Sequence, residues 1–186
     1  MARPLKILRG GITWLGHLKM AGQVKIKRLY SMFITTHAAL GALIAEQMPN
    51  HPILAFVLGA ASHFLSDIIP HGDLNLYKGF VSGSKVKRAI AYVTIDSVVA
   101  IFFVLFIFNT KIFDHRLAIS MGIAGGVLPD LIVAAYEVFR IKELKFFHRF
   151  HFFFHNLISG RRGDLPFASG FAMQLMFLAA IISRIG

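Results

Sequence analysis

The residues of this chain best suited to chemistry are histidines and aspartates that stand in or beside apolar segments. They are His37, His63, Asp67, His71, Asp73, Asp96, Asp130, His148, His151 and His155. An aspartate at the centre of a membrane helix costs about 2.5–3.5 kcal/mol on insertion scales, so such groups need partners. A divalent metal ion is the first candidate, because it satisfies several of these groups at once.

Spacing along the chain supports a shared ion. His63, Asp67 and His71 follow one another at i, i+4 and i+8, so the first two share one helix face. Two imidazole or carboxylate ligands one turn apart can hold one cation. His71 and Asp73 follow Pro70 and could reach the same ion from a turn. We expect one site whose metal ligands are His37, His63, Asp67, His71, Asp130, His148 and His155.

Zinc is the metal that this donor set predicts. The chain has no cysteine, which excludes thiolate sites and cysteine nucleophiles. Three or four nitrogen and oxygen ligands with an open position allow zinc to lower the pKa of a water molecule toward neutrality. A spare acid or base must then take the proton, and we expect Asp73, Asp96 and His151 in that catalytic role.

Composition indicates that a membrane surrounds these residues. Of the 186 residues, 56% are hydrophobic and 16% are charged, which is too apolar for an ordinary soluble domain. The net charge of +11 also suggests nucleic acid, but the basic residues lie between the apolar runs, as they do beside membrane spans. We therefore expect membrane lipid as the partner and no nucleic acid.

The apolar runs predict an all-α bundle with four to five embedded segments. Helices are expected over residues 32–47, 52–69, 89–108, 116–139 and 165–183, with the fourth interrupted by Gly125, Gly126 and Pro129. The first two are short for spans and could instead form a helical hairpin. Residues 142–158 are rich in Phe and His and too polar to span, which predicts an interfacial or re-entrant helix.

Charge placement predicts the orientation. If the amino terminus is inside, seventeen of the twenty Lys and Arg residues lie on the inner side. This asymmetry predicts a multi-pass protein of the cytoplasmic (inner) membrane, with the His and Asp residues in its cytoplasmic half. The outer part of the third segment, residues 98–108, carries no charged group.

Residues 1–31 stand apart as a basic segment with no acidic residue. Three interpretations remain open: a tail on the anionic membrane face, a transit peptide, or translation that begins at Met32. We expect the membrane domain to comprise residues 32–186, and deletion of the first 31 residues to leave folding intact.

These motifs together resemble a known family. Thr36-His37, the Leu58-Gly59 pair before His63-x-x-x-Asp67-x-x-Pro-His71-x-Asp73, Gly-x-Leu-Pro129-Asp130, and His148-Arg149-x-His151-x-x-x-His155 resemble the membrane-bound metal-dependent hydrolases. These proteins are also called LexA-binding, inner-membrane-associated hydrolases and are distantly similar to zinc-dependent phospholipase C. The resemblance covers roughly residues 32–158 by motif order. It implies hydrolysis, with a phosphoester among the candidate substrates.

Two functions therefore remain. The first is a metal-dependent hydrolase that acts on a small or lipid-linked ester at the cytoplasmic face. The second is a non-enzymatic membrane protein whose His and Asp residues conduct ions or protons or form a structural polar core. Transport would require polar groups in the outer half as well, so the apolar residues 98–108 favour a one-sided site.

Overall fold

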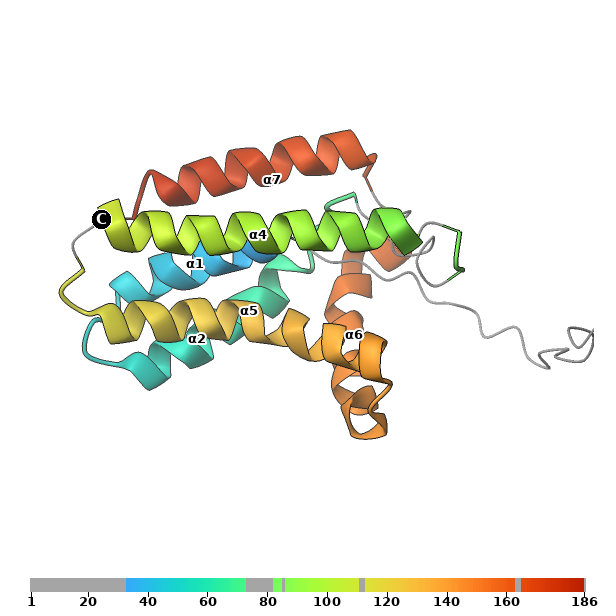
Figure 1. Cartoon of the computed structure of the whole chain (residues 1–186), viewed down its shortest axis with the longest axis horizontal. Helices are drawn as coiled ribbons and strands as arrows, with labels where there is room; N and C mark the ends of the chain where they lie inside the picture. The colour runs from blue at the N-terminus through green and yellow to red at the C-terminus, as the bar shows by residue number, and fades with distance from the viewer. Residues whose placement is uncertain (1–32, 73–81, 85, 111–112, 163–164, 186) are drawn as a thin grey trace, which may run out of the picture.

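The computed structural model describes residues 33–72, 82–84, 86–110, 113–162 and 165–185, and this part of the chain is all-α (Figure 1). It contains six α-helices and one short 3-10 helix, η1. The elements are α1 (Ile34–Glu46), α2 (Pro52–Ser66), α4 (Val86–Thr110), α5 (Arg116–Phe139), η1 (Lys142–Leu144), α6 (Lys145–Arg162) and α7 (Phe167–Ile182).

The helix ends follow local chemistry. Pro52 occupies the first turn of α2, where its fixed φ is favourable and no intrahelical N–H is needed. Helix α5 ends at Phe139, and the next residue, Arg140, adopts a left-handed conformation with φ of 53° and donates its amide to the carbonyl of Tyr136. The expected interruption of α5 is absent, because the helix continues through Pro129. Neighbouring helices can support a proline within a helix of this kind.

Glycines let α1, α2 and α5 approach each other closely. A Cβ atom added at Gly41 of α1 or Gly59 of α2 would collide with the backbone carbonyl of Gly122 in α5. One added at Gly126 would collide with the carbonyl of His37. Small residues at such crossings bring helix backbones together, as in membrane bundles. This packing places the functional residues of three helices beside one another.

The apolar core lies beside these crossings. Its buried residues are Ala38, Ala39, Ala42, Ala45, Ala55, Phe103, Ile107, Ile119, Ile181 and Ile185. Helix α1 is in the interior and contacts α2, α4, α5 and α7. In Figure 1, α4 and α7 run along the side of the bundle away from α2. The candidate residues of α1, α2, α4 and α5 therefore come from helices that share one core.

Among the residues that the structure describes, two helices are long and apolar enough to cross a membrane, Lys87–Thr110 and Arg116–Phe139. At 1.5 Å per residue, each of these 24-residue segments is about 36 Å long, which exceeds a hydrocarbon core of roughly 30 Å. The helices α1, α2 and α7 have 13, 15 and 16 residues, fewer than the usual 17–25 of a span.

Helix α6 has a different direction from the rest. It runs across the end of the bundle where α4 begins and α5 ends (Figure 1). The sequence predicted a non-spanning His- and Phe-rich helix over residues 142–158, and the structure has η1 followed by α6 there.

Candidate metal centre

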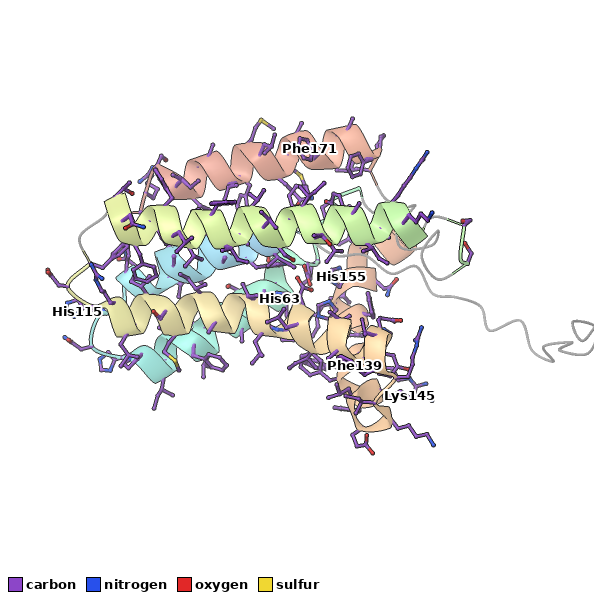
Figure 2. The ribbon with its side chains drawn as sticks, viewed as in Figure 1. His63, His115, Phe139, Lys145, His155 and Phe171 are labelled. Carbon is purple, nitrogen blue, oxygen red and sulfur yellow. The ribbon has the colours of Figure 1, made fainter. Side chains whose placement is uncertain are left out.

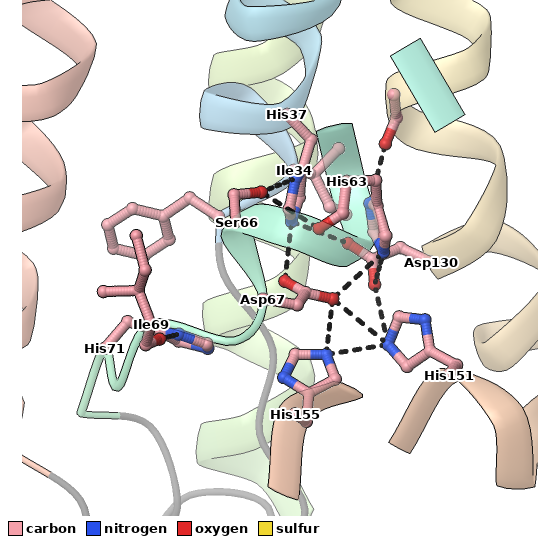
Figure 3. A network of polar contacts seen from close by, with 12 residues as sticks. Ile34, His37, His63, Ser66, Asp67, Ile69, His71, Asp130, His151 and His155 are labelled. Carbon is pink, nitrogen blue, oxygen red and sulfur yellow. Dashed lines mark hydrogen bonds and ion pairs between the residues drawn. The ribbon is translucent and has the colours of Figure 1, made fainter. Parts of the chain in front are cut away.

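Six of the predicted residues meet in one buried group, which we call the His/Asp cluster (Figure 3). Its members are His37, His63, Asp67, Asp130, His151 and His155, each at most 8% exposed. They come from four places: the first turns of α1, the end of α2, the middle of α5 and the inner face of α6. The cluster thus joins segments more than one hundred residues apart.

Asp67 lies at the centre of this cluster. Its Oδ1 is 3.1 Å from Nε2 of His37, and its Oδ2 is 3.1 Å from Nε2 of His63. The same Oδ2 is 2.6 Å from Nε2 of His155 and 3.6 Å from Nε2 of His151. The two oxygens of one carboxylate therefore face four imidazole rings.

Asp130 is the second carboxylate of the His/Asp cluster. Its Oδ1 lies 3.8 Å from Nε2 of His63 and 3.6 Å from Nε2 of His151, and its Oδ2 lies 4.0 Å from Nε2 of His37. One ligand atom from each of His63, Asp67, Asp130 and His151 lies within 4.8 Å of the other three. This is a spacing at which one ion could contact all four residues.

The hydrogen bonds of two histidines fix which ring nitrogen carries the proton. Nδ1 of His63 lies 2.8 Å from the carbonyl oxygen of Gly126, which can only accept, so Nδ1–H donates. Ser66 donates its single hydroxyl proton to the carbonyl of His63, so it accepts from Nδ1–H of His37 at 3.3 Å. In the neutral rings, Nε2 of both histidines therefore carries no proton and presents a lone pair. Such outer partners hold metal-ligating histidines in the required tautomer.

These lone pairs point at negative charge. Nε2 of His37 and Nε2 of His63 are buried and form no hydrogen bond of acceptable geometry with any described residue, although each is 3.1 Å from an oxygen of Asp67. A lone pair this close to a carboxylate oxygen is repelled unless a cation or an added proton is present. The donor set therefore fits a metal ion.

Burial keeps the two histidines of α6 in the form that binds metal. It lowers the pKa of His151 well below its usual value, and the neighbouring His155 lowers it further. Burial also lowers the pKa of His155, against the opposing effect of Asp67. Both shifts favour the neutral imidazole, which metal ligation requires.

Asp96, an expected catalytic residue, accepts hydrogen bonds from the start of α1. Its Oδ2 accepts the amide of Ile34 at 2.6 Å, and its Oδ1 accepts the hydroxyl of Thr35 at 2.7 Å. It therefore supplies from α4 the cap that no side chain of α1 provides. This interaction fixes the turn that leads into His37.

Two expected ligands lie outside the His/Asp cluster. Nε2 of His148 lies 2.8 Å from a carboxylate oxygen of Glu137, and its ring packs on Tyr136. His71 is buried beside the cluster, with its ring centroid 5.6 Å from that of His155, and its Nδ1–H donates to the carbonyl of Ile69 at 2.6 Å. Asp73 lies outside the described residues.

Sequence reasoning missed Gln174, which connects two parts of the site. Its Oε1 accepts the amide of Phe33 at 2.7 Å, and its Nε2 donates to the carbonyl of His71 at 3.3 Å. This buried residue is the one amide side chain of α7, a helix otherwise rich in apolar residues. That contrast was the available signal. The sequence held no signal for the role of Ser66, because its partner His37 is 29 residues away.

The His/Asp cluster has the chemistry of a divalent-metal site. Nitrogen and oxygen donors suit zinc and related ions, and four ligands complete a tetrahedral zinc site. The six donors exceed this number, so the cluster can hold an ion and still keep spare acids or bases. Figure 2 shows His63 and His155 in the interior, whereas His115 lies at the far end of the bundle.

Comparison with protein-family models, curated proteins and solved structures finds no match for this chain.

Proposed function

We propose that this protein is a membrane-embedded, metal-dependent hydrolase that acts on a phosphoester or lipid-linked substrate at the cytoplasmic face. The observation that carries the proposal is a buried group in which four imidazoles face Asp67 and in which His63, Asp67, Asp130 and His151 are close enough to share one ion. Buried carboxylates facing imidazole lone pairs are costly without a cation, so their assembly supports metal binding.

The exposure of α4 supports a membrane location. Only 17% of its most apolar 18-residue stretch is buried within the protein. Ile101, Phe102, Leu105 and Phe106 are all more than half exposed. A core helix of a soluble protein would cover such residues, whereas lipid covers them at no cost. We propose α4 and α5 as spans, with the shorter α1, α2 and α7 embedded beside them.

The position of the charges supports the orientation. Lys87 and Arg88 begin α4, and Arg140, Lys142 and Lys145 follow α5, at the end of the bundle where α6 lies. Positive residues gather on the cytoplasmic side of membrane proteins. The His/Asp cluster is contacted by α6, which places it toward the same side.

Zinc is our proposed ion, held by His63, Asp67, Asp130 and His151. A bound divalent ion supplies a Lewis acid and makes a water molecule a stronger nucleophile. Asp67 balances the positive charge, and Gly126 keeps the His63 ring in the ligating tautomer. His155 lies beside the four ligands and is the nearest spare base for the proton of the attacking water.

Hydrolysis is our choice among metal-dependent functions because of the motif resemblance described above. All six members of the His/Asp cluster stand at motif positions that resemble the membrane-bound metal-dependent hydrolases. A phosphoester is the substrate class that this resemblance implies.

Metal analysis joined to a hydrolysis assay tests the proposal. Wild type, His63→Ala and His115→Ala would be purified in detergent, and zinc per protein would be measured. His115 is the matched control because it is an exposed histidine far from the cluster. We expect near-stoichiometric zinc in wild type and His115→Ala, and at least a tenfold loss in His63→Ala.

The same samples distinguish a metal-dependent hydrolase from a protein whose His and Asp residues form only a structural or proton-conducting layer. Bis(p-nitrophenyl) phosphate hydrolysis should stop on chelation, return with zinc, and be absent in His63→Ala. A protein that binds no zinc even after reconstitution would have a structural or proton-conducting His/Asp layer instead. Zinc binding without hydrolysis of any phosphoester or carboxylic ester tested would overturn the enzymatic part alone.

A further inference from the structure

Helix α6 has two opposite faces with different character. Phe146, Phe150 and Phe153 follow at i, i+4 and i+7 and form one stripe. At about 100° per residue, His151 and His155 lie roughly on the other side of the helix from this stripe. The histidines are buried in the His/Asp cluster, whereas the phenylalanines are exposed. One rigid helix therefore connects an apolar outer surface to the metal centre.

The outer surface of α6 exposes three aromatic side chains. The side chains of Phe146, Phe150 and Phe153 are 79%, 42% and 60% exposed. Val138 and Phe139, at the end of α5, are also mostly exposed, and α5 contacts α6. Exposed aromatic groups of this size signal contact with another molecule or with a membrane. We call these five residues the α6 apolar surface.

Positive charge borders this surface. Lys145 and Arg149 are exposed on α6, and Arg140 and Lys142 are exposed in the segment before it. Between Arg140 and Arg149, the only acidic residue is Glu143, which is exposed. Aromatic side chains beside Lys and Arg are typical of a helix that lies in the headgroup layer of an anionic membrane. The direction of α6 across the ends of α4 and α5 also suits this layer (Figure 1).

The inner face of α6 packs against an aromatic side chain of α2. Phe64, next to His63, packs against Phe147, Phe150 and Phe154 of α6 at centroid distances of 5.2–6.2 Å. Its ring also contacts that of His151 at 5.9 Å. Phe150 thus belongs both to this contact and to the α6 apolar surface. A force that positions the outer surface also positions the histidines.

We infer that the α6 apolar surface docks in the headgroup–acyl boundary of an anionic bilayer leaflet, and that this docking holds His151 and His155 in the metal centre. The bilayer is the occupant favoured here because the surface joins apolar area to cationic flanks. The membrane contact stands independently, whereas the effect on metal affinity rests on the proposed function.

Depth-dependent fluorescence quenching tests the membrane contact without metal or activity. Trp14 is the only tryptophan, so a Trp14→Phe background can carry a single new one. Phe146→Trp and Phe153→Trp would be compared in phosphatidylglycerol nanodiscs with Phe102→Trp, whose exposed side chain lies in the middle of α4. We expect lipids brominated near the headgroup to quench positions 146 and 153 most, and deeply brominated lipids to quench position 102 most.

Two outcomes would overturn the membrane contact. If aqueous iodide but no brominated lipid quenches the indole introduced by Phe146→Trp, α6 lies in water. If neither quencher reaches that indole and a dimer can be cross-linked, a second copy of the chain covers the surface. Either result leaves the metal proposal standing.

Zinc affinity tests the link to the metal centre. We expect zinc to bind about tenfold more tightly in phosphatidylglycerol nanodiscs than in phosphatidylcholine nanodiscs. Lys145→Gln with Arg149→Gln should remove this difference, while the control Arg116→Gln, at the far end of α5, should retain it. Equal affinity in the two lipids, or an unchanged difference in the double variant, would overturn the link. Absence of zinc binding in every sample would instead refute the proposed function.

Discussion

Replacement of Asp67 with Asn should weaken zinc binding more than any other change of similar size. The amide keeps the shape of the carboxylate but removes the charge that faces His37, His63, His151 and His155. Loss of one partner from a buried charged group costs about 3–5 kcal/mol. Because about 1.4 kcal/mol is tenfold in an equilibrium constant, zinc affinity should fall roughly 100-fold to several thousand-fold.

Competition with a fluorescent zinc chelator measures this loss in detergent-solubilised protein. Asp114→Asn is the control, because Asp114 is an exposed carboxylate at the other end of the bundle. Circular dichroism of both variants must show unchanged helix content. If Asp67→Asn folds and binds zinc as tightly as wild type, Asp67 does not contact the metal and our interpretation of the cluster is wrong.

Three further predictions concern the residues that support the site. Ser66→Ala removes the acceptor that orients His37, whose Nε2 lies 3.1 Å from the proposed ligand Asp67, and should lower zinc affinity by about tenfold, measured by the same chelator competition. Gln174→Leu leaves the buried amide of Phe33 without an acceptor and should lower the free energy of unfolding by about 1–3 kcal/mol, measured by denaturant titration. Single cysteines at Ser82, which precedes α4, and at Asn109, near the end of α4, should react with impermeant reagents from opposite sides of the membrane.

Matched variants make these predictions specific. Ser62→Ala removes a hydroxyl that donates to the carbonyl of Gly59 in its own helix and should leave zinc affinity unchanged. Gln47→Leu changes an exposed glutamine at the end of α1 and should leave stability unchanged. Equal effects in a variant and its control would contradict the assigned role. Labelling of Ser82 and Asn109 from the same side would end the proposed topology.

Local patterns predicted much of the fold and part of the site. The apolar run predicted a helix over residues 116–139, and α5 has these bounds. The i, i+4 spacing of His63 and Asp67 placed both on one face, and both belong to the group that can hold a metal. Such features depend on the helical repeat alone, so they can be deduced without knowledge of tertiary structure.

Features set by packing between helices could not be predicted in this way. Pro129 was expected to interrupt α5, yet the helix continues, closely packed against α1 and α2. Asp96 caps a helix that begins 62 residues earlier, a pairing that only tertiary contacts decide. His148 and His151 are one turn apart, but His148 meets Glu137 and His151 meets the cluster. Their different partners follow from how α6 crosses the bundle.

Zinc K-edge X-ray absorption of the purified protein tests the central claim most directly, because it reports the atoms around the ion. The claim predicts nitrogen and oxygen scatterers at about 2.0–2.2 Å, with the outer-shell pattern of imidazole and no sulfur. His63→Ala should lose part of the imidazole pattern, and His115→Ala should keep it all. A hydrated ion without imidazole, or a spectrum that His63→Ala leaves unchanged, would contradict a metal centre built from the His/Asp cluster.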